Sequence, residues 1–204
     1  MITIVDYGVG NIQAFVNIYK ELGIPCFLAK TKEDLKNASK IILPGVGHFD
    51  FAMKKLTDSG MIEILNHKVL QEKTPVLGIC VGMQMMAKNS DEGVLNGLGW
   101  FDAQVKKIDT TSLQQKTRLP HMGWNSVKQV KENIFFNNRE KYEEFYFLHS
   151  FSMKCEESDD IVAVANYGEE IVTIVQKENI VGVQCHPEKS HQVGIQFLQN
   201  FAKL

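Results

Sequence analysis

The sequence predicts an α/β protein with an open, mostly parallel β-sheet, helices on both faces, and an antiparallel β extension in its second half. In the first half, short apolar runs alternate with segments of helical periodicity. In the second half, β-rich runs are separated by turn residues. No internal repeat, low-complexity segment or linker interrupts the 204 residues. We therefore expect a single domain over residues 1–204.

The first half contains the elements expected of a parallel sheet covered by helices. Short apolar runs predict four strands, Met1–Val5, Pro25–Ala29, Lys40–Leu43 and Pro75–Ile79. The segments between and after them predict helices over Ile12–Leu22, Lys32–Asn37, Phe49–Leu56, Met61–Leu70 and Val81–Lys88.

The second half is expected to form an antiparallel meander and a last helix. Its predicted strands are Ala103–Ile108, Phe145–His149, Ile161–Asn166, Ile171–Val175 and Ile180–Cys185. Ser190 is a suitable N-cap for the last helix, which carries Phe197 and Phe201 at helical spacing.

The composition is that of a globular protein without a strong charge. The chain has 22 basic and 24 acidic side chains, so its formal net charge is 22 − 24 = −2, and 44% of its residues are hydrophobic. This balance gives no electrostatic footprint for nucleic acid or an anionic membrane. No run approaches the roughly 20 apolar residues of a membrane span, and the first strand reaches Asp6 too soon for a signal peptide. We therefore expect a cytoplasmic protein.

Neither the cysteines nor the histidines are spaced like metal ligands. The four cysteines include no CxxC pair, which in a cytoplasmic chain favours free thiols over a disulfide framework. The sequence also lacks GxxxxGK[ST] and a complete GxGxxG, the motifs that bind nucleotide phosphates. We therefore expect neither a metal nor a cofactor.

The strongest local motif for chemistry is GICVG at residues 78–82, centred on Cys80. An apolar strand ends there and a helix follows at once. Glycines two residues before and two after a nucleophile allow the sharp strand-to-helix turn called a nucleophile elbow. A thiol at that turn lies at a helix N-terminus, where unpaired N–H groups favour the thiolate. Taken alone, the motif fits a nucleophile and a buried structural cysteine about equally.

His186 and Glu188 follow another apolar strand, in the sequence HPE. In an extended segment, residues i and i+2 point to the same side, so Glu188 is expected to orient the ring of His186. The imidazole can then take the thiol proton while the carboxylate fixes its tautomer. A lone HPE also fits a surface turn, but both strand ends can lie at the carboxyl edge of one sheet, where α/β proteins bind ligands. Together the two motifs predict a Cys80–His186–Glu188 triad.

The loop PGVG at residues 44–47 follows a third strand, at the same edge of the sheet. Its glycines let backbone N–H groups face a ligand. Such a loop can form an oxyanion hole together with the N–H of the residue after the nucleophile, Val81. Taken alone, the loop is only a turn signal.

These motifs resemble those of the class I (triad) glutamine amidotransferases, which implies a flavodoxin-like fold. The similarity rests on PGVG at 44–47, GICVGMQ at 78–84 and HPE at 186–188. More narrowly, four segments resemble the glutaminase subunits of imidazole glycerol phosphate synthases: DYGVGN at 6–11, PHMGWN at 120–125, YFLHS at 146–150 and HPEKS at 186–190. The similarity extends from the first strand to the last helix.

The resemblance implies a role for each matching residue. Cys80 would attack the side-chain amide of glutamine, His186 would act as base and then as acid, and Glu188 would orient His186. The oxyanion hole would be formed by Val46, Gly47 and Val81. The glutamine pocket would include Gln84, Glu92, His149, Ser150 and Phe151, where the family usually has tyrosine at the last position. The face that docks a partner would include Asn11, Trp124, Asn125 and Lys189.

Ammonia released into water is protonated and ceases to be a nucleophile, so a second subunit has to shelter and use it. The resemblance implies a heterodimer with a (β/α)₈-barrel cyclase that makes imidazole glycerol phosphate in histidine biosynthesis. Three other interpretations stay open on the sequence. They are a paralogue that supplies ammonia to a surface-polysaccharide sugar, a non-catalytic regulatory or scaffold subunit, and a free-standing cysteine hydrolase.

Overall fold

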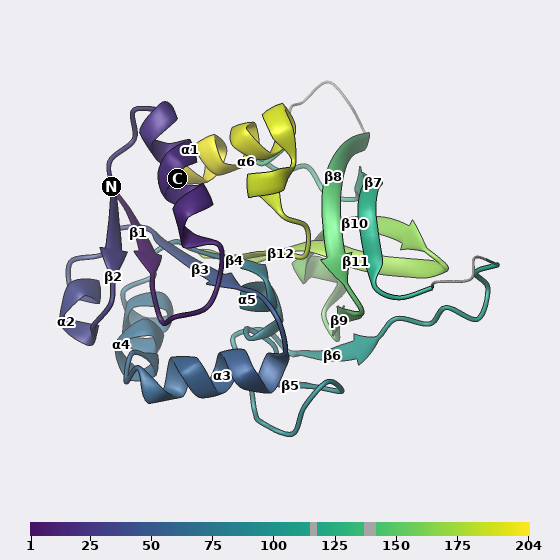
Figure 1. Ribbon diagram of the computed structural model, residues 1–204, viewed down its shortest axis with the longest axis horizontal. Helices are drawn as coiled ribbons and strands as arrows, with labels where there is room; N and C mark the ends of the chain where they lie inside the picture. The colour runs from purple at the N-terminus through teal and green to yellow at the C-terminus, as the bar shows by residue number, and fades with distance from the viewer. Residues whose placement is uncertain (115–117, 137–141) are drawn as a thin grey trace.

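The computed structural model describes residues 1–114, 118–136 and 142–204. Its main element is a nine-stranded sheet with the strand order β2-β1-β3-β4-β12-β11-β10-β7-β8 (Figure 1). The parallel part consists of β2 (Cys26–Ala29), β1 (Ile2–Val5), β3 (Ile41–Gly45), β4 (Val76–Cys80) and β12 (Ile180–Val183). The antiparallel part consists of β11 (Glu169–Lys177), β10 (Ile161–Tyr167), β7 (His121–Gln129) and β8 (Tyr142–His149). The predicted α/β class is confirmed, and the antiparallel extension continues the same sheet.

Helices cover both faces of the parallel part (Figure 1). On one face lie α1 (Ile12–Glu21) and α6 (His191–Lys203), and on the other lie α3 (Phe49–Asp58) and α4 (Ile62–Asn66). The predicted helix Met61–Leu70 corresponds to α4 and the π-helical turn η1 (His67–Gln71) that continues it. The short α2 (Lys32–Leu35) begins with a capping box between Thr31 and Asp34.

The burial of the strands explains why the first half reads as nearly continuous apolar runs. Every residue of β1, β3, β4 and β12 is buried, as expected for parallel strands covered on both faces. The main cluster of buried apolar side chains extends from Ile2 in β1 to Phe201 in α6. This continuity supports the proposal of one domain. In the described part of the chain, no helix has the length and apolar character needed to cross a bilayer.

A second, three-stranded sheet lies beside the main one and was not predicted. It contains β5 (Asn89–Ser90), β6 (Ala103–Lys107) and β9 (Phe151–Cys155). The predicted strand Ala103–Ile108 therefore belongs to this small sheet, and its assignment to the meander was wrong. The cause is a change of sheet at Ser150, because β8 and β9 are separated by that residue alone.

Candidate active site

Cys80 lies at the end of β4, where the chain turns sharply into the one-turn helix α5 (Val81–Gln84). Its φ of +54° is in the left-handed region that non-glycine residues rarely occupy. The flanking glycines make this turn possible. A Cβ on Gly82 would lie 2.0 Å from the carbonyl oxygen of Leu43, and one on Gly78 would lie 2.7 Å from that of Gly82. The expected elbow is present, and it places the thiol at the carboxyl edge of the sheet.

The helix after Cys80 is shorter than predicted. Helical spacing suggested Val81–Lys88, whereas α5 ends at Gln84 and the N–H of Lys88 donates to the carbonyl of Ala103. The helix therefore ends early, because the chain after it pairs with β6. One helical turn carries only a small dipole, so a cationic group that acts on the Cys80 sulfur must lie elsewhere.

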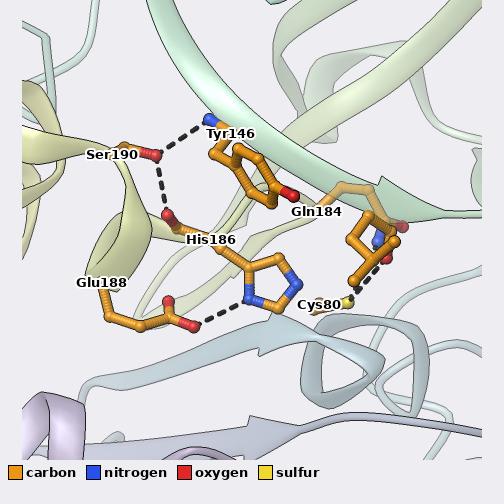
Figure 2. A network of polar contacts seen from close by, with 7 residues as sticks. Cys80, Tyr146, Gln184, His186, Glu188 and Ser190 are labelled. Carbon is orange, nitrogen blue, oxygen red and sulfur yellow. Dashed lines mark hydrogen bonds and ion pairs between the residues drawn. The ribbon is translucent and has the colours of Figure 1, made fainter. Parts of the chain in front are cut away.

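His186 is that group, and its ring lies beside Cys80 with Nε2 turned toward the sulfur (Figure 2). Nδ1 of His186 is 2.8 Å from Oε1 of Glu188, and the two side chains are only 4% and 2% exposed. The predicted contact is present, but its local geometry differs from the prediction. The 3₁₀ turn η3 (Pro187–Lys189), and not an extended segment, brings the carboxylate back to the ring.

The charges around His186 decide its protonation. Burial by itself would lower the pKa of His186, but hydrogen bonding to Cys80 and Glu188 and the charges of both outweigh burial and raise the pKa to about 10. At neutral pH the ring is therefore an imidazolium facing the sulfur. In contrast, burial raises the pKa of Cys185 far above its ordinary value and that of Cys155 to about 12, so these two stay unreactive thiols.

The backbone of His186 is fixed between strand β8 and Ser190 (Figure 2). The N–H of His186 donates to the carbonyl of Tyr146 at 2.8 Å. Oγ of Ser190 donates to the carbonyl of His186 at 2.7 Å and accepts the N–H of Tyr146 at 3.0 Å. Ser190 stands directly before α6, as predicted, but its side chain makes no cap hydrogen bond. Its hydroxyl positions the imidazolium instead.

The loop Pro44–Gly47 lies beside Cys80 because β3 and β4 pair in parallel, with Gly45 opposite Cys80. A Cβ on Gly45 would lie 2.3 Å from the amide nitrogen of Gly82, so only glycine permits this approach. The hydroxyl of Tyr7 donates to the carbonyl of Pro44 at 2.6 Å. Burial and the neighbouring Cys80 raise the pKa of Tyr7, so the hydroxyl keeps its proton and remains a donor.

The thiol opens into a cavity of about 300 Å³, at the lower end of the size range of small-molecule sites. The predicted residues that line this cavity are Val46, Gly47, Cys80, Val81, Gln84, Glu92, His149, Ser150, Phe151, His186 and Lys189. Oε2 of Glu92 accepts the N–H of Phe49, two residues after the loop Pro44–Gly47, at 2.9 Å. Nε2 of Gln84 donates to the carbonyl of Phe151 and to Oε1 of Gln184, both at 3.0 Å. The arrangement can bind a small polar molecule and attack a carbonyl carbon in it.

The family follows from comparison with known proteins. The sequence model of glutamine amidotransferase class-I matches residues 3–204. The chain belongs to the class I glutamine amidotransferases. A protein of Bdellovibrio bacteriovorus named imidazole glycerol phosphate synthase subunit HisH is 53% identical over 204 residues, which is 100% of both chains. A protein of the same name from Leptospira interrogans is 47% identical over 204 residues, again 100% of both.

A solved structure confirms the fold of this amidotransferase independently of close sequence similarity. The crystal structure of a glutamine amidotransferase superposes with a TM-score of 0.74 at 15% identity, covering 100% of this chain and 99% of the other. Within the described residues of the amidotransferase, no group of three His, Cys, Asp or Glu side chains is arranged to hold a metal ion. All four cysteines are free.

Two of the four residues predicted for the docking face lie exposed on the surface, and one of them, Lys189, borders the cavity. Trp124 is 46% exposed and stacks on His191, with the ring centroids 5.0 Å apart. Nζ of Lys189 lies 5.7 Å from the ring centroid of Tyr146. An aromatic, partly charged surface of this kind suits a protein partner, and contact with one stays a prediction.

The other two predicted docking residues are placed differently. Asn11 is exposed before α1, and its side chain makes no helix-cap hydrogen bond. Asn125 is half-buried on β7, and its amide donates to the carbonyl of Asn166 at 2.9 Å. The same Nδ2 lies 3.2 Å from Nε2 of His121. The amide nitrogen of Asn125 therefore makes its contacts within the amidotransferase itself.

Four residues in or beside the cavity were missing from the prediction. Nε2 of Gln184 lies 3.7 Å from Sγ of Cys80. Strand alternation could have identified it, because Gln184 and His186 are two residues apart after the same strand. Leu148 and Pro120 line the cavity within motifs that carried the family resemblance. Tyr7 also lies in such a motif, at residues 6–11, but its partner Pro44 is met only in the folded chain.

Tyr7→Phe tests whether the oxyanion loop depends on the tyrosine hydroxyl. The variant keeps the buried ring but leaves the carbonyl of Pro44 without its donor. We expect kcat for glutamine hydrolysis to fall by up to about 10²-fold, because the loop then no longer presents its amides in one orientation. Alkylation of Cys80 by iodoacetamide forms no oxyanion, so we expect its rate to stay unchanged.

Tyr19→Phe is the matched control, because the hydroxyl of Tyr19 also donates to a backbone carbonyl, that of Leu198, at 3.2 Å. Tyr19 is fully buried and does not line the cavity. Both variants should lose about 1 kcal/mol of the free energy of unfolding. Only Tyr7→Phe should lose glutaminase activity. Equal losses of activity in both, or slower alkylation of Tyr7→Phe, would contradict a role specific to the oxyanion loop.

Proposed function

We propose that this chain is the glutaminase subunit of an imidazole glycerol phosphate synthase and that Cys80 is its nucleophile. The observation that carries the proposal is the ring of His186, held by Glu188 and turned toward the Cys80 sulfur beside the loop Pro44–Gly47, and its raised pKa supports the charged form. A thiolate paired with an imidazolium is the form of cysteine that attacks amides. The names of the two full-length relatives support the choice of pathway.

The first half of the reaction follows from this geometry. The thiolate of Cys80 attacks the side-chain amide carbon of glutamine, and the carbonyl oxygen takes up the negative charge. The N–H of Val81 and an amide of the Val46–Gly47 segment stabilise that oxyanion. Nε2–H of His186 then protonates the leaving nitrogen, the C–N bond breaks, and ammonia departs from a glutamyl thioester.

The second half reverses the role of the imidazole. His186 is now neutral and takes a proton from water, which attacks the thioester carbon. The C–S bond breaks, glutamate leaves, and the proton on His186 restores the thiolate–imidazolium pair. Glu188 keeps its hydrogen bond to Nδ1 throughout, so that Nε2 always faces the reacting atoms.

The polar groups at the far side of the cavity suit the amino-acid end of glutamine. Glu92 supplies a carboxylate, and Oε1 of Gln84 supplies a neutral acceptor, because both N–H groups of that amide are already used. Both are acceptors for the α-ammonium group. The segment His149–Phe151 borders the same space and supplies backbone groups.

The partner in this proposal is a (β/α)₈-barrel cyclase that takes up ammonia directly, in a cytoplasmic heterodimer. The exposed aromatic surface around Trp124 and the neighbouring Lys189 would contact it next to the cavity. Asn11, exposed in the loop before α1, would extend the contact.

Complementation of a histidine auxotroph tests the pathway. A strain that lacks its own glutaminase subunit, supplied with this chain and the barrel subunit from the same source, should grow without histidine at low ammonium. Cys80→Ala should support growth only when ammonium is abundant. Failure to grow combined with active glutamine hydrolysis would favour the surface-polysaccharide paralogue. Failure of both would favour a non-catalytic subunit.

A further inference from the structure

A line of polar groups runs through the protein from strand β7 to Cys80, and the proposed mechanism leaves its first members without a role. Nδ2 of Asn125 lies 3.2 Å from Nε2 of His121, and Nδ1 of His121 lies 3.0 Å from Nε2 of His149. Nδ1 of His149 lies 2.8 Å from the carbonyl oxygen of Phe151. His121 and His149 are 3% and 6% exposed, so water has little access to them.

The end of the line at Phe151 fixes its direction. A carbonyl oxygen can only accept, so Nδ1 of His149 must carry a proton. If the ring is neutral, Nε2 of His149 is then an acceptor. Its neighbour, Nδ1 of His121, must therefore be the donor.

The end at Asn125 fixes the same direction independently. Nδ2 of Asn125 lies 2.9 Å from the carbonyl oxygen of Asn166, which identifies that atom as the amide nitrogen and not the oxygen. Nδ2 therefore donates to Nε2 of His121, which must lack a proton. A neutral His121 then carries its proton on Nδ1, as the other end of the line also requires.

Packing keeps both rings neutral and in place. Burial lowers the pKa of His121 to about 4. Burial also lowers the pKa of His149 to about 3, together with repulsion from His121 and His186 and against the hydrogen bond to Phe151. His121 lies between two aromatic rings, with its centroid 4.0 Å from that of Tyr167 and 4.8 Å from that of Phe147. The stacking holds the plane of the His121 ring.

Beyond Phe151 the line continues to the glutamine pocket and the nucleophile. The carbonyl of Phe151 also accepts Nε2–H of Gln84, whose second N–H goes to Oε1 of Gln184. This leaves Oε1 of Gln84 as an acceptor, and it turns Nε2 of Gln184 toward Sγ of Cys80, at 3.7 Å. The orientation of both amides therefore depends on where the carbonyl of Phe151 is held.

We propose that His121 is a positioning residue for glutamine binding. Its Nδ1–H fixes His149, and through His149 it holds the carbonyl of Phe151 and the amide of Gln84 in the orientation that receives the substrate. Asn125 sets the tautomer of His121 and so the direction of the whole line. The inference rests on the proposed glutaminase function, but the tautomers themselves can be measured without substrate.

Histidine ring ¹⁵N NMR of the full chain measures the tautomers directly. We expect His121 and His149 both to be neutral, with the proton on Nδ1. A proton on Nε2 of His121, or a positively charged ring at neutral pH, would overturn the proposal.

Asn125→Asp reverses the chemistry at the start of the line, because a carboxylate accepts and never donates. Because burial holds His121 neutral, its proton is then expected to move from Nδ1 to Nε2, so Nδ1 can no longer donate to Nε2 of His149. In the complex with the barrel subunit, we expect KM for glutamine to rise about tenfold or more, the effect of weakening one hydrogen bond to the charged ammonium group. We expect kcat and ammonia-dependent turnover to change by less than about twofold, since His186 and the oxyanion loop stay in place.

Two further variants keep the test decisive. Asn200→Asp makes the same chemical change on α6, where Asn200 donates to the carbonyl of Ile134, and it should leave KM unaltered. His121→Phe keeps an aromatic ring between Tyr167 and Phe147 but removes both nitrogens, and it should raise KM as Asn125→Asp does. Unchanged KM in both Asn125→Asp and His121→Phe would overturn the proposal. If the control variant and the unmodified chain also fail to hydrolyse glutamine, the proposed function itself is refuted.

Discussion

Cys80→Ala is expected to lower glutamine-dependent turnover of the complex by about 10⁴-fold or more, as removal of a covalent nucleophile does in other enzymes. Without the sulfur no thioester forms, and the remaining groups cannot activate water against an amide. The barrel subunit still accepts ammonia from solution, so turnover with added ammonium salt should stay within about twofold of the unmodified complex. Steady-state rates with each nitrogen source measure both quantities.

Cys26→Ala is the matched control for this substitution. Cys26 lies on β2 at the far edge of the sheet and does not border the cavity. The Cys26→Ala variant should keep both glutamine-dependent and ammonia-dependent turnover. Glutamine-dependent turnover that survives in Cys80→Ala, with the partner present, would contradict the assignment of the nucleophile. Loss of ammonia-dependent turnover as well would indicate that the substitution disturbs docking.

Glu188→Gln is expected to lower kcat/KM for glutamine by about 10²- to 10⁴-fold, because a neutral amide no longer fixes the tautomer of His186 or stabilises its charge. The variant should also shift the pH profile. The pKa of His186 is raised to about 10, and its imidazolium supplies the proton to the leaving ammonia. Activity should therefore fall as pH rises through that pKa. Removing the carboxylate lowers the pKa of His186, so the fall should begin at a lower pH.

Rates measured from neutral to alkaline pH test this shift, with Glu144→Gln as control. Glu144 is an exposed carboxylate on β8, and its substitution should leave the profile unchanged. An alkaline limb at the same pH in Glu188→Gln and the unmodified chain would contradict the role of Glu188. The raised pKa of His186 also increases the free energy of unfolding. The increase is fully present below pH 6.5, the ordinary pKa of histidine, and is lost as the pH rises toward 10.

The parts of the site that the sequence predicted are those defined by local pattern. The glycines around Cys80 and in the Pro44–Gly47 loop indicate that two backbone segments approach closely, and this can be recognised without knowing the rest of the fold. The pair His186 and Glu188 is close in the chain, so any compact turn after β12 brings the two together. Even the wrong assumption of an extended segment therefore led to the right contact.

The parts that escaped prediction depend on contacts between distant segments. Strand β7 has no run of apolar residues on its buried side, because its buried positions are His121 and Val127. Its sequence therefore does not show the apolar alternation that predicts a strand. Ser190 was placed correctly as the residue before α6, but its hydroxyl bonds to β8, which no local rule anticipates. Tyr7 contacts a residue 37 positions away, and only the fold reveals it.

The fate of the amide nitrogen of glutamine tests whether Cys80 releases the ammonia that the barrel subunit uses. The complex is given [amide-¹⁵N]glutamine, the substrate of the barrel subunit and an excess of unlabelled ammonium, and the mass of the imidazole product is measured. We expect ¹⁵N in the product of the unmodified complex and only ¹⁴N in that of Cys80→Ala. Unlabelled product from the unmodified complex, or ¹⁵N in the product of Cys80→Ala, would contradict this role of Cys80.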